Sequence, residues 1–307
     1  MPKVLVATVK PFAPAAVNQI REITEKAGYE FVLLEKYSSQ DELVSVVDDA
    51  DALIIRSDKV DNDVIAAAGK LLYIFNVLIK VDNIDLEAAS AKGVVAMNTP
   101  GQNSNAVAEL ALGMMVYMAR NQLNGTSGTE LSGKTLGIHA YGYVGKLVAK
   151  IAKGFGMVVY AFDPYIAREV IEGDGVTCLD SAKALYETCQ YISLHIPATA
   201  ETRGSINHDL LSVMPDGAVL VNTARKEVID EMSLEKIFEG RPDFRYVSDI
   251  APDNAAQLKD TYPDRCFFTP KKMESQTSQA NINAGVAAAN QIVAFLEEGD
   301  RTFQVNK

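Results

Sequence analysis

The residues with the clearest chemical meaning form a short turn between two apolar segments, Ala140-Tyr141-Gly142-Tyr143-Val144-Gly145. A strand is expected to end at this turn and a helix to begin within it, so the helix N-terminus would direct free amide groups at a phosphate. We predict that Gly142 lets the backbone approach a pyrophosphate, which the amides of Tyr143 and Val144 would bind. Gly145 would let the helix pack closely on the sheet. Such turns usually begin with glycine, and here the first position is Ala140.

A second apolar segment, residues 157–162, ends in an acid, Asp163. A carboxylate at the end of the second strand is suited to bind the hydroxyl groups of an adenosine ribose, and it would repel a 2′-phosphate. The succession of strand, turn, helix, strand and acid therefore predicts a dinucleotide site that prefers NAD to NADP.

The composition restricts the compartment and the partners. The 307 residues are enough for two domains, and the formal net charge of −11 argues against nucleic acid or an anionic membrane as a partner. A small anionic substrate remains compatible, because local arginines can override the global field. The three cysteines show neither metal-ligand spacing nor a disulfide framework, which indicates a reducing cytoplasm. Without a signal segment or an apolar run of about 18 residues, neither export nor a membrane span is expected.

The elements that must position these residues alternate between strand and helix. Ser39 and Glu42 have the spacing of a capping box that opens one helix. This alternation predicts an α/β fold of two doubly wound, parallel-sheet (Rossmann-like) domains with a cleft between them. Strands are expected at residues 4–7, 31–34, 52–55, 136–138, 157–162, 191–195, 218–222, 246–250 and 267–269.

Two long helices suggest how the domains are connected. The helix 280–298 is expected to cross back onto the first domain, whose sheet needs a covering element. Residues 1–98 with 280–307 would then form a flavodoxin-like substrate-binding domain, and residues 99–279 an NAD-binding Rossmann domain. The helix 104–117 has apolar residues on more than one face, which predicts a homodimer.

Several short motifs follow one another in a specific order along nearly the whole chain: Ile55-Arg56-Ser57, Asp82-Asn83-Ile84-Asp85, Asn98-Thr99-Pro100-Gly101, Val107-Ala108-Glu109, Ser193-Leu194-His195-Ile196-Pro197, Val221-Asn222-Thr223-Ala224-Arg225, Ser248-Asp249-Ile250 and Thr269-Pro270-Lys271-Lys272. In this order and spacing they resemble the D-isomer-specific 2-hydroxyacid dehydrogenase family, and within it the short D-3-phosphoglycerate dehydrogenases that lack a C-terminal regulatory domain.

The resemblance implies NAD-dependent oxidation of 3-phospho-D-glycerate to 3-phosphooxypyruvate, a step of serine biosynthesis, by a homodimer that binds a small anionic 2-hydroxyacid. Two alternatives remain open. One is a reductase for glyoxylate, hydroxypyruvate or another D-2-hydroxyacid, and the other is a catalytically impaired NAD-binding scaffold.

The resemblance also implies roles for particular residues. Arg225 would hold the substrate carboxylate and polarise its carbonyl, and Asp249 would orient the nicotinamide carboxamide. Lys271 stands where the family usually has histidine, and a lysine desolvated beside Arg225 could have its pKa lowered to about 7–8 and act as the base. The partner glutamate of that histidine falls at or near Asn254, with Asp253 beside it. Further cofactor contacts are implied at Pro164, His195, Ile196, Pro197, Thr202, Thr223 and Ala224, and substrate contacts at Arg56, Ser57, Lys59 and Asn103.

Residues 73–81 depart from the family. The family has an arginine and then a glycine-rich loop that binds the substrate carboxylate, whereas this segment contains neither arginine nor glycine. Bulky and β-branched residues do not easily adopt the positive φ angles that such a loop can require. Lys80 could replace the missing charge but not the backbone geometry. An altered substrate site, an inactive protein and a local sequence error all remain open.

Overall fold

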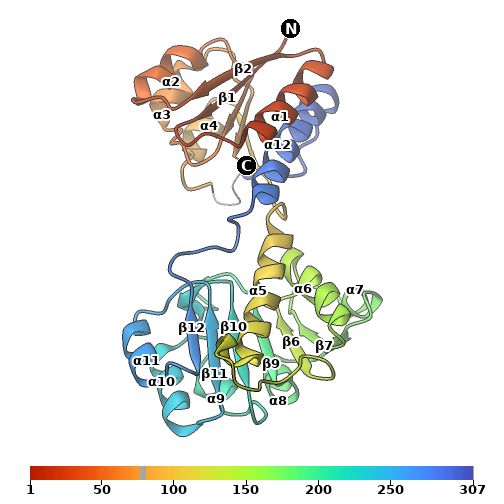
Figure 1. Ribbon diagram of the computed structural model, residues 1–307. Helices are drawn as coiled ribbons and strands as arrows, with labels where there is room; N and C mark the ends of the chain where they lie inside the picture. The colour runs from red at the N-terminus through yellow and green to blue at the C-terminus, as the bar shows by residue number, and fades with distance from the viewer. Residues whose placement is uncertain (77–80, 307) are drawn as a thin grey trace. The chain divides into compact units, whose positions relative to one another are not determined.

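The computed structural model describes residues 1–76 and 81–306, and its chain forms two compact α/β units (Figure 1). Unit 1 consists of Met1–Asn103 and Gln276–Lys307, and unit 2 of Ser104–Ser275. Both are built on parallel sheets, as the alternation of strand and helix predicts.

Unit 1 holds a five-stranded sheet in the order β2-β1-β3-β4-β5, and neighbouring strands of this sheet pair in parallel. Its elements are β1 (Lys3–Thr8), α1 (Pro14–Lys26), β2 (Glu30–Glu35), α2 (Gln40–Val47), β3 (Ala52–Ile55), α3 (Asn62–Ala67), β4 (Tyr73–Asn76), α4 (Leu86–Ala91), β5 (Val95–Asn98) and α12 (Ser278–Glu298).

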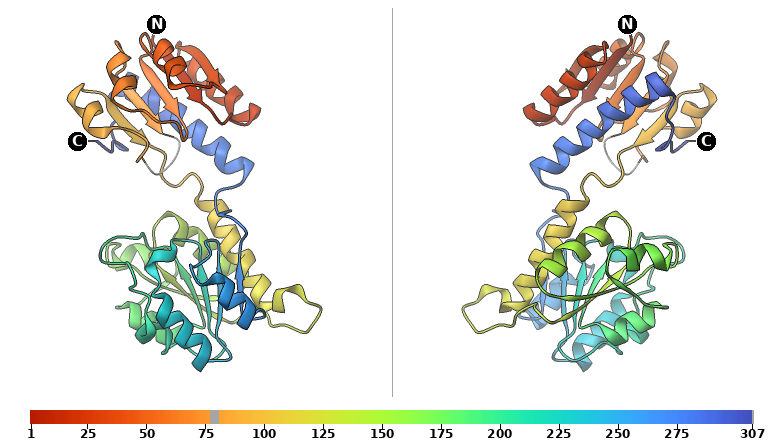
Figure 2. Two further views of the ribbon diagram at one scale, coloured as in Figure 1. Left: turned by 90° about the vertical axis from the view of Figure 1, so that its left-hand side faces the viewer. Right: turned by 90° about the vertical axis from the view of Figure 1, so that its right-hand side faces the viewer.

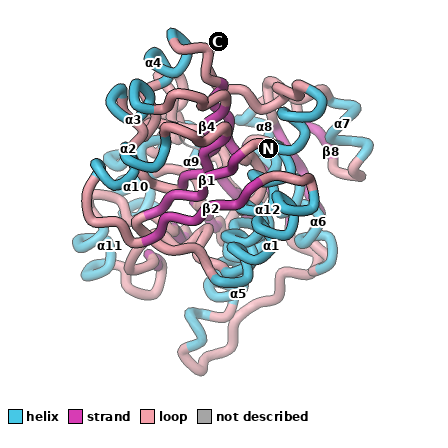
Figure 3. Tube along the Cα trace, turned by 90° about the horizontal axis from the view of Figure 1, so that it is seen from above, coloured by secondary structure: helices cyan, strands magenta, loops and turns pink. Residues whose placement is uncertain are grey.

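Helices cover both faces of this sheet (Figure 3). Along β1, Val4 and Val6 pack with α1 and α12, and Leu5 and Ala7 pack with α2 and α3 on the opposite face. This alternation follows from the two-residue period of a strand, and burial on both faces explains why the strands are apolar throughout.

The alanine-rich helix α12 packs against α1, beside which it runs in Figure 2. Ala288, Ala289 and Ile292 are buried in the same core cluster as β1 and β3. A Cβ atom added to Gly285 would lie 2.9 Å from Cδ1 of Ile20, so this glycine permits the close approach of the two helices.

Residues 73–81 differ from the family pattern, and the first part of this segment is a strand, not a loop. The residues of β4 are buried, with Tyr73 and Phe75 packed toward α12 and Ile74 toward the opposite face. Burial on both faces accounts for their bulk. Asn76, at the end of β4, donates from Nδ2 to Oδ1 of Asn83 at 2.6 Å. Lys80 and its neighbours 77–79 lie outside the described residues.

Ser39 is the N-cap of α2, as its spacing from Glu42 predicts, but the hydrogen bonds of a capping box are not formed. Oε1 of Glu42 accepts hydrogen bonds from the backbone and the hydroxyl of Ser38, each within 2.8 Å, and Ser39 makes no side-chain cap. Glu42 therefore fixes Ser38, the residue before the N-cap, and not the N-cap itself.

Unit 2 holds a seven-stranded parallel sheet in the order β12-β11-β10-β9-β6-β7-β8. Its elements are α5 (Ser104–Ala119), the 3₁₀ helix η1 (Asn121–Leu123), β6 (Thr135–His139), α6 (Tyr143–Gly154), β7 (Val158–Phe162), α7 (Arg168–Gly173), β8 (Thr177–Cys178), α8 (Ala182–Thr188), β9 (Tyr191–Leu194), α9 (His208–Leu211), β10 (Val219–Asn222), the 3₁₀ helix η2 (Lys226–Val228), α10 (Glu231–Gly240), β11 (Arg245–Ser248), α11 (Ala255–Thr261) and β12 (Cys266–Phe268). The strand order reverses between β6 and β9, which is where doubly wound sheets bind ligands.

The apolar residues of α5 are largely buried within unit 2. Val107, Ala111, Met114 and Met115 are buried, and all but Val107 belong to a core cluster that also contains residues of β6, β7, β9, β10 and β11. These residues therefore give no reason to expect a second copy of the chain on this helix, and the homodimer stays a prediction. No helix among the described residues is both long and apolar enough to cross a membrane.

Tyr73→Phe is expected to raise the free energy of unfolding by about 1 kcal/mol, because it removes a buried hydroxyl group that has no partner among the described residues. The ring, which stacks on Phe295 with centroids 4.5 Å apart, is retained. Tyr37→Phe is the matched control, because the hydroxyl of Tyr37 donates to Asp58 at 2.8 Å and its loss should destabilise unit 1. Denaturant titration of both variants measures the two changes, and changes of the same sign would contradict this interpretation.

Candidate active site

The cofactor residues predicted from the sequence lie after the C-terminal ends of five adjacent strands of unit 2. The glycine turn follows β6, Asp163 and Pro164 follow β7, and Thr223, Ala224 and Arg225 follow β10. His195, Ile196, Pro197 and Thr202 follow β9, and Asp249 follows β11. Because parallel strands end at one edge of a sheet, these loops share one face of unit 2.

The turn after β6 has the geometry of a phosphate-binding loop. Gly142 is the N-cap of α6, and a Cβ atom on it would meet nothing within 4 Å, so the backbone is open to a ligand. Tyr143 and Val144 begin the helix, where amide groups have no intrahelical acceptor. A Cβ atom on Gly145 would lie 2.4 Å from the carbonyl oxygen of Ala140, so only glycine lets α6 pack this closely.

Ala140 adopts the backbone conformation that normally requires glycine at the first position of the turn. Its φ is 80°, in the region that L-residues with a side chain rarely occupy. Its amide donates to the carbonyl of Phe162 at 2.9 Å, which joins the turn to the end of β7. The turn therefore keeps the expected shape despite the alanine, at a cost in backbone strain.

Asp163 connects the glycine turn after β6 to the loop after β7, in which it lies. Its Oδ2 accepts from the amide of Tyr141 at 2.7 Å, and its Oδ1 accepts from the amide of Tyr165 at 2.8 Å. A carboxylate has about four acceptor positions, so this arrangement leaves capacity for the hydroxyl groups of a ribose.

Two histidines lie at the ends of β6 and β9. His139 is buried, and its Nδ1 lies 3.3 Å from the hydroxyl of Tyr186. Nε2 of His195 lies 3.0 Å from Oγ of Ser193. Burial lowers the pKa of His139 to about 4 and the pKa of His195 to about 3, so both rings are neutral at physiological pH.

The buried side-chain amide of Asn222 holds the loop after β10. Asn222 accepts from the amide of Ala224 at 2.9 Å and donates from Nδ2 to the carbonyl of Arg225 at 3.0 Å. Nη1 of Arg225 donates to the carbonyl of Ala224 at 2.7 Å, so the guanidinium keeps further donors for a ligand. Thr223 is 2% exposed, and its hydroxyl has no partner among the described residues, which suits a bound polar group.

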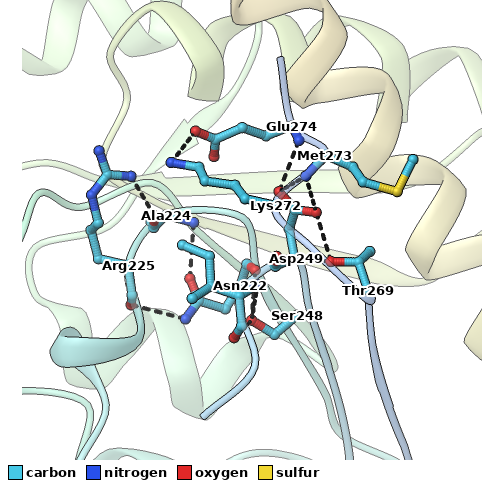
Figure 4. A network of polar contacts seen from close by, with 10 residues as sticks. Asn222, Ala224, Arg225, Ser248, Asp249, Thr269, Lys272, Met273 and Glu274 are labelled. Carbon is cyan, nitrogen blue, oxygen red and sulfur yellow. Dashed lines mark hydrogen bonds and ion pairs between the residues drawn. The ribbon is translucent and has the colours of Figure 1, made fainter. Parts of the chain in front are cut away.

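Asp249 is fully buried and anchors the segment that follows β12 (Figure 4). Its carboxylate accepts from Oγ1 of Thr269 at 2.9 Å, from the amide of Met273 at 2.8 and 3.0 Å, and from the amide of Glu274 at 2.8 Å. The carboxylate is thus occupied by its own chain, and its predicted role toward nicotinamide stays a prediction.

The anchored segment carries Lys271 and Lys272, both of them exposed. The predicted role of Lys271 as the base stays a prediction. Lys272 forms an ion pair with Glu274, which is 9% exposed, and both side chains extend to the side of Arg225 (Figure 4). Glu274 is not among the residues predicted from the sequence, although residues 272 and 274 share a face of any extended segment.

Asp253 and Asn254, at the position of the family glutamate, do not supply a buried carboxylate. Asp253 is largely exposed and pairs with Lys226. Asn254 donates from Nδ2 to Oε1 of Glu235 at 2.7 Å. Both side chains are therefore committed to the α10–α11 side of the loop.

The substrate residues predicted in unit 1 follow β3, except Asn103, which immediately precedes α5. Nη2 of Arg56 donates to Oδ1 of Asn281 on α12 at 2.9 Å, and Lys59 pairs with Asp61 at 3.0 Å. Ser57 and Lys59 line a pocket of about 470 Å³ between the loops that follow β1, β2 and β3. The sheet order of unit 1 also reverses between β1 and β3, so this pocket lies at a favoured ligand position.

The sheet order of unit 2, the glycine turn and the acid after β7 define a dinucleotide-binding α/β protein. Residues 94–270 match the model of the D-isomer specific 2-hydroxyacid dehydrogenase NAD binding domain. The chain belongs to this family of dehydrogenases.

Named relatives agree with this membership. The chain is 38% identical to D-3-phosphoglycerate dehydrogenase of Methanocaldococcus jannaschii over 273 residues, which are 84% of this chain and 52% of the relative. It is 37% identical to hydroxypyruvate reductase of Thermotoga maritima over 227 residues, 69% of this chain and 73% of the relative. The chain spans about half the length of most of the curated relatives it matches.

A solved structure covers the whole chain. The NAD⁺-bound 3-phosphoglycerate dehydrogenase of Entamoeba histolytica is 45% identical, with a TM-score of 0.80, and the match covers 100% of this chain and 99% of that one. The fold prediction of two Rossmann-like parallel-sheet domains is thereby confirmed.

Ala140→Gly is expected to raise the free energy of unfolding by about 1 kcal/mol, because glycine adopts a φ of 80° without the strain that alanine carries. Ala149→Gly, in the middle of α6, is the matched control and should lower the free energy of unfolding by about 1 kcal/mol or more. Denaturant titration measures both. A lower unfolding free energy in Ala140→Gly would contradict the interpretation that the backbone of Ala140 is strained.

The unfolding free energy is expected to fall as the pH is lowered from about 6.5 toward 4. In that interval the unfolded chain protonates its histidines, whereas His139 and His195 stay neutral in the folded state. Each contributes a slope of up to about 1.4 kcal/mol per pH unit, and neither contributes above pH 6.5. Denaturation at several pH values should show a shallower slope for His139→Gln and for His195→Gln, and an unchanged slope in both would refute the assignment.

Proposed function

We propose that this protein is an NAD-dependent D-2-hydroxyacid dehydrogenase that oxidises 3-phospho-D-glycerate to 3-phosphooxypyruvate. The observation that carries the proposal is that one sheet edge of unit 2 holds the glycine turn after β6, Asp163 after β7 and Arg225 after β10. The relatives from Methanocaldococcus jannaschii and Entamoeba histolytica, both named phosphoglycerate dehydrogenases, support this choice of substrate.

The residues present fit NAD. Gly142 leaves open space over the first turn of α6, where Tyr143 and Val144 would bind the pyrophosphate, and Gly145 fits only as glycine. Asp163 would bind the adenosine ribose, and the unpartnered hydroxyl of Thr223 would meet the cofactor. When bound, NAD supplies the hydride acceptor. The further contacts predicted from the sequence remain part of this proposal: Pro164, His195, Ile196, Pro197, Thr202, Ala224 and Asp249.

Arg225 would bind the carboxylate of the hydroxyacid, because its guanidinium is a permanent cation with donors left free by its single described hydrogen bond. Arg56, Ser57, Lys59 and Asn103 are the substrate ligands proposed in unit 1. We further propose a cytoplasmic homodimer, which rests on the resemblance alone.

A second function is favoured by a specific observation. The relative from Thermotoga maritima is a hydroxypyruvate reductase, so reduction of hydroxypyruvate or glyoxylate is the alternative reaction. The absence of arginine and glycine from residues 73–81 supports a substrate site that differs from the one the family uses.

The test is an assay of the purified protein with 3-phosphoglycerate and NAD, and with hydroxypyruvate and NADH. We expect turnover of 3-phosphoglycerate, and fluorescence titration should show tighter binding of NADH than of NADPH, because Asp163 repels a 2′-phosphate. Equal affinities would refute the ribose assignment. NADH binding without turnover of any short hydroxyacid or ketoacid would instead indicate the catalytically impaired scaffold.

A further inference from the structure

We propose that Asn281, in the first turn of α12, is a positioning residue for Arg56. Its amide oxygen holds the guanidinium group without neutralising it, so Arg56 keeps its charge for an anionic group of the substrate. This inference rests on the function proposed above, in which Arg56 is a substrate ligand, and adds a residue that this function does not include.

Helix α12 brings Asn281 to the end of β3. Asn281 lies one turn before Gly285, so the two residues share the face of α12 that packs against α1. Gly285 lets that face approach Ile20 closely. Arg56 directly follows β3, and its Nη2 donates to Oδ1 of Asn281 at 2.9 Å although the two residues are 225 positions apart. The contact therefore depends on the packing of α12 and not on the local sequence.

The orientation of the Asn281 amide follows from its two partners. A guanidinium group has only donors, so it must face the amide oxygen. On the other side, Nδ2 of Asn281 donates to the carbonyl oxygen of Thr277, the N-cap of α12, at 2.9 Å. Asn281 thus presents one fixed acceptor to Arg56.

The backbone of Arg56 is held separately, by Asp58. Oδ2 of Asp58 accepts from the amide of Arg56 at 3.3 Å, and its Oδ1 accepts from the amide of Val9 at 2.7 Å and from the hydroxyl of Tyr37 at 2.8 Å. Asp58 is buried, so these contacts fix the point from which the side chain of Arg56 extends. A carboxylate therefore holds the backbone of Arg56, and a neutral amide holds its guanidinium group.

The charge of Arg56 remains available to a ligand. Its guanidinium group forms no ion pair among the described residues, and its one hydrogen bond leaves most of its five donors unused. Arg241, by contrast, makes three hydrogen bonds, one of them to the carboxylate of Asp243. Arg225, the other proposed substrate ligand, resembles Arg56, because its guanidinium group has one neutral acceptor. Both arginines are thus held in place and left charged.

Two substitutions of Asn281 separate position from charge. Asn281→Ala removes the acceptor, and we expect the KM for 3-phosphoglycerate to rise about tenfold while kcat and the affinity for NADH change much less. Asn281→Asp supplies a carboxylate that holds the guanidinium group more firmly but neutralises it, so the KM should rise at least as far. A merely structural contact predicts a different result, because aspartate would preserve it and keep the wild-type KM.

The controls exclude a folding defect. Asn283 lies on the same helix and is exposed, so Asn283→Ala should keep the wild-type KM. Asn281→Gln should restore part of the loss seen in Asn281→Ala, because it retains a neutral acceptor. Denaturant titration should show no loss of unfolding free energy in Asn281→Asp, since a carboxylate near a helix N-terminus is favourable.

A double-mutant cycle tests whether Asn281 acts through Arg56. Arg56→Met removes the charge and should itself raise the KM about tenfold or more. Asn281→Ala should then have little further effect, because the group that it positions is gone. Additive effects of the two substitutions would overturn the proposal.

Binding measured without turnover separates this inference from the proposed function. NADH and a hydroxyacid do not react with each other, so calorimetric titration of the NADH-saturated protein with 3-phosphoglycerate or D-glycerate gives the affinity directly. If the wild type has no turnover but binding is weakened in Asn281→Ala and Asn281→Asp, the dehydrogenase function is overturned and the role of Asn281 stands. If the wild type binds neither compound, or if Asn281→Asp binds as tightly as the wild type, the role of Asn281 is overturned, and turnover alone then decides the function.

Discussion

Parallel pairing of the strands is the constraint on which the site depends. Each strand of unit 2 enters the sheet from the same edge, so residues far apart in sequence, from Ala140 to Glu274, are carried to the opposite edge together. The helix that follows β6 begins at that edge and directs free amide groups at it. The backbone at this edge therefore favours an anionic ligand even without the charge of a lysine or arginine side chain.

Two aspartates fix the backbone of the loops at this shared edge. Asp163 holds amides of the loops after β6 and β7, and Asp249, in the loop after β11, holds two amides of the loop after β12. Each carboxylate accepts two or more backbone hydrogen bonds, which compensates the loss of hydration on burial. The positions of these loops are thus fixed by two side chains, and the backbone of Glu274 is held by one of them.

Much of the fold could be predicted from the sequence because apolar strands, turn glycines and helix starts are local signals. The missed strand β4 carries bulky residues where a family loop was expected, and only the sheet shows that Tyr73 and Phe75 fill one of its faces and Ile74 the other. The glycine turn was predictable for the same local reason. Glu274 was not, because the direction of its side chain is set by Asp249, which lies far away in the sequence and close in space.

The return of α12 to unit 1 has a consequence for how the chain folds during synthesis. Unit 2 is one continuous segment and can complete its core as soon as it leaves the ribosome. Unit 1, whose core includes Ala288 and Ile292, must wait with one face of its sheet uncovered until α12 emerges. The first half to be made is thus the last to be finished, and a chaperone that shields apolar strands would act on the N-terminal segment in that interval.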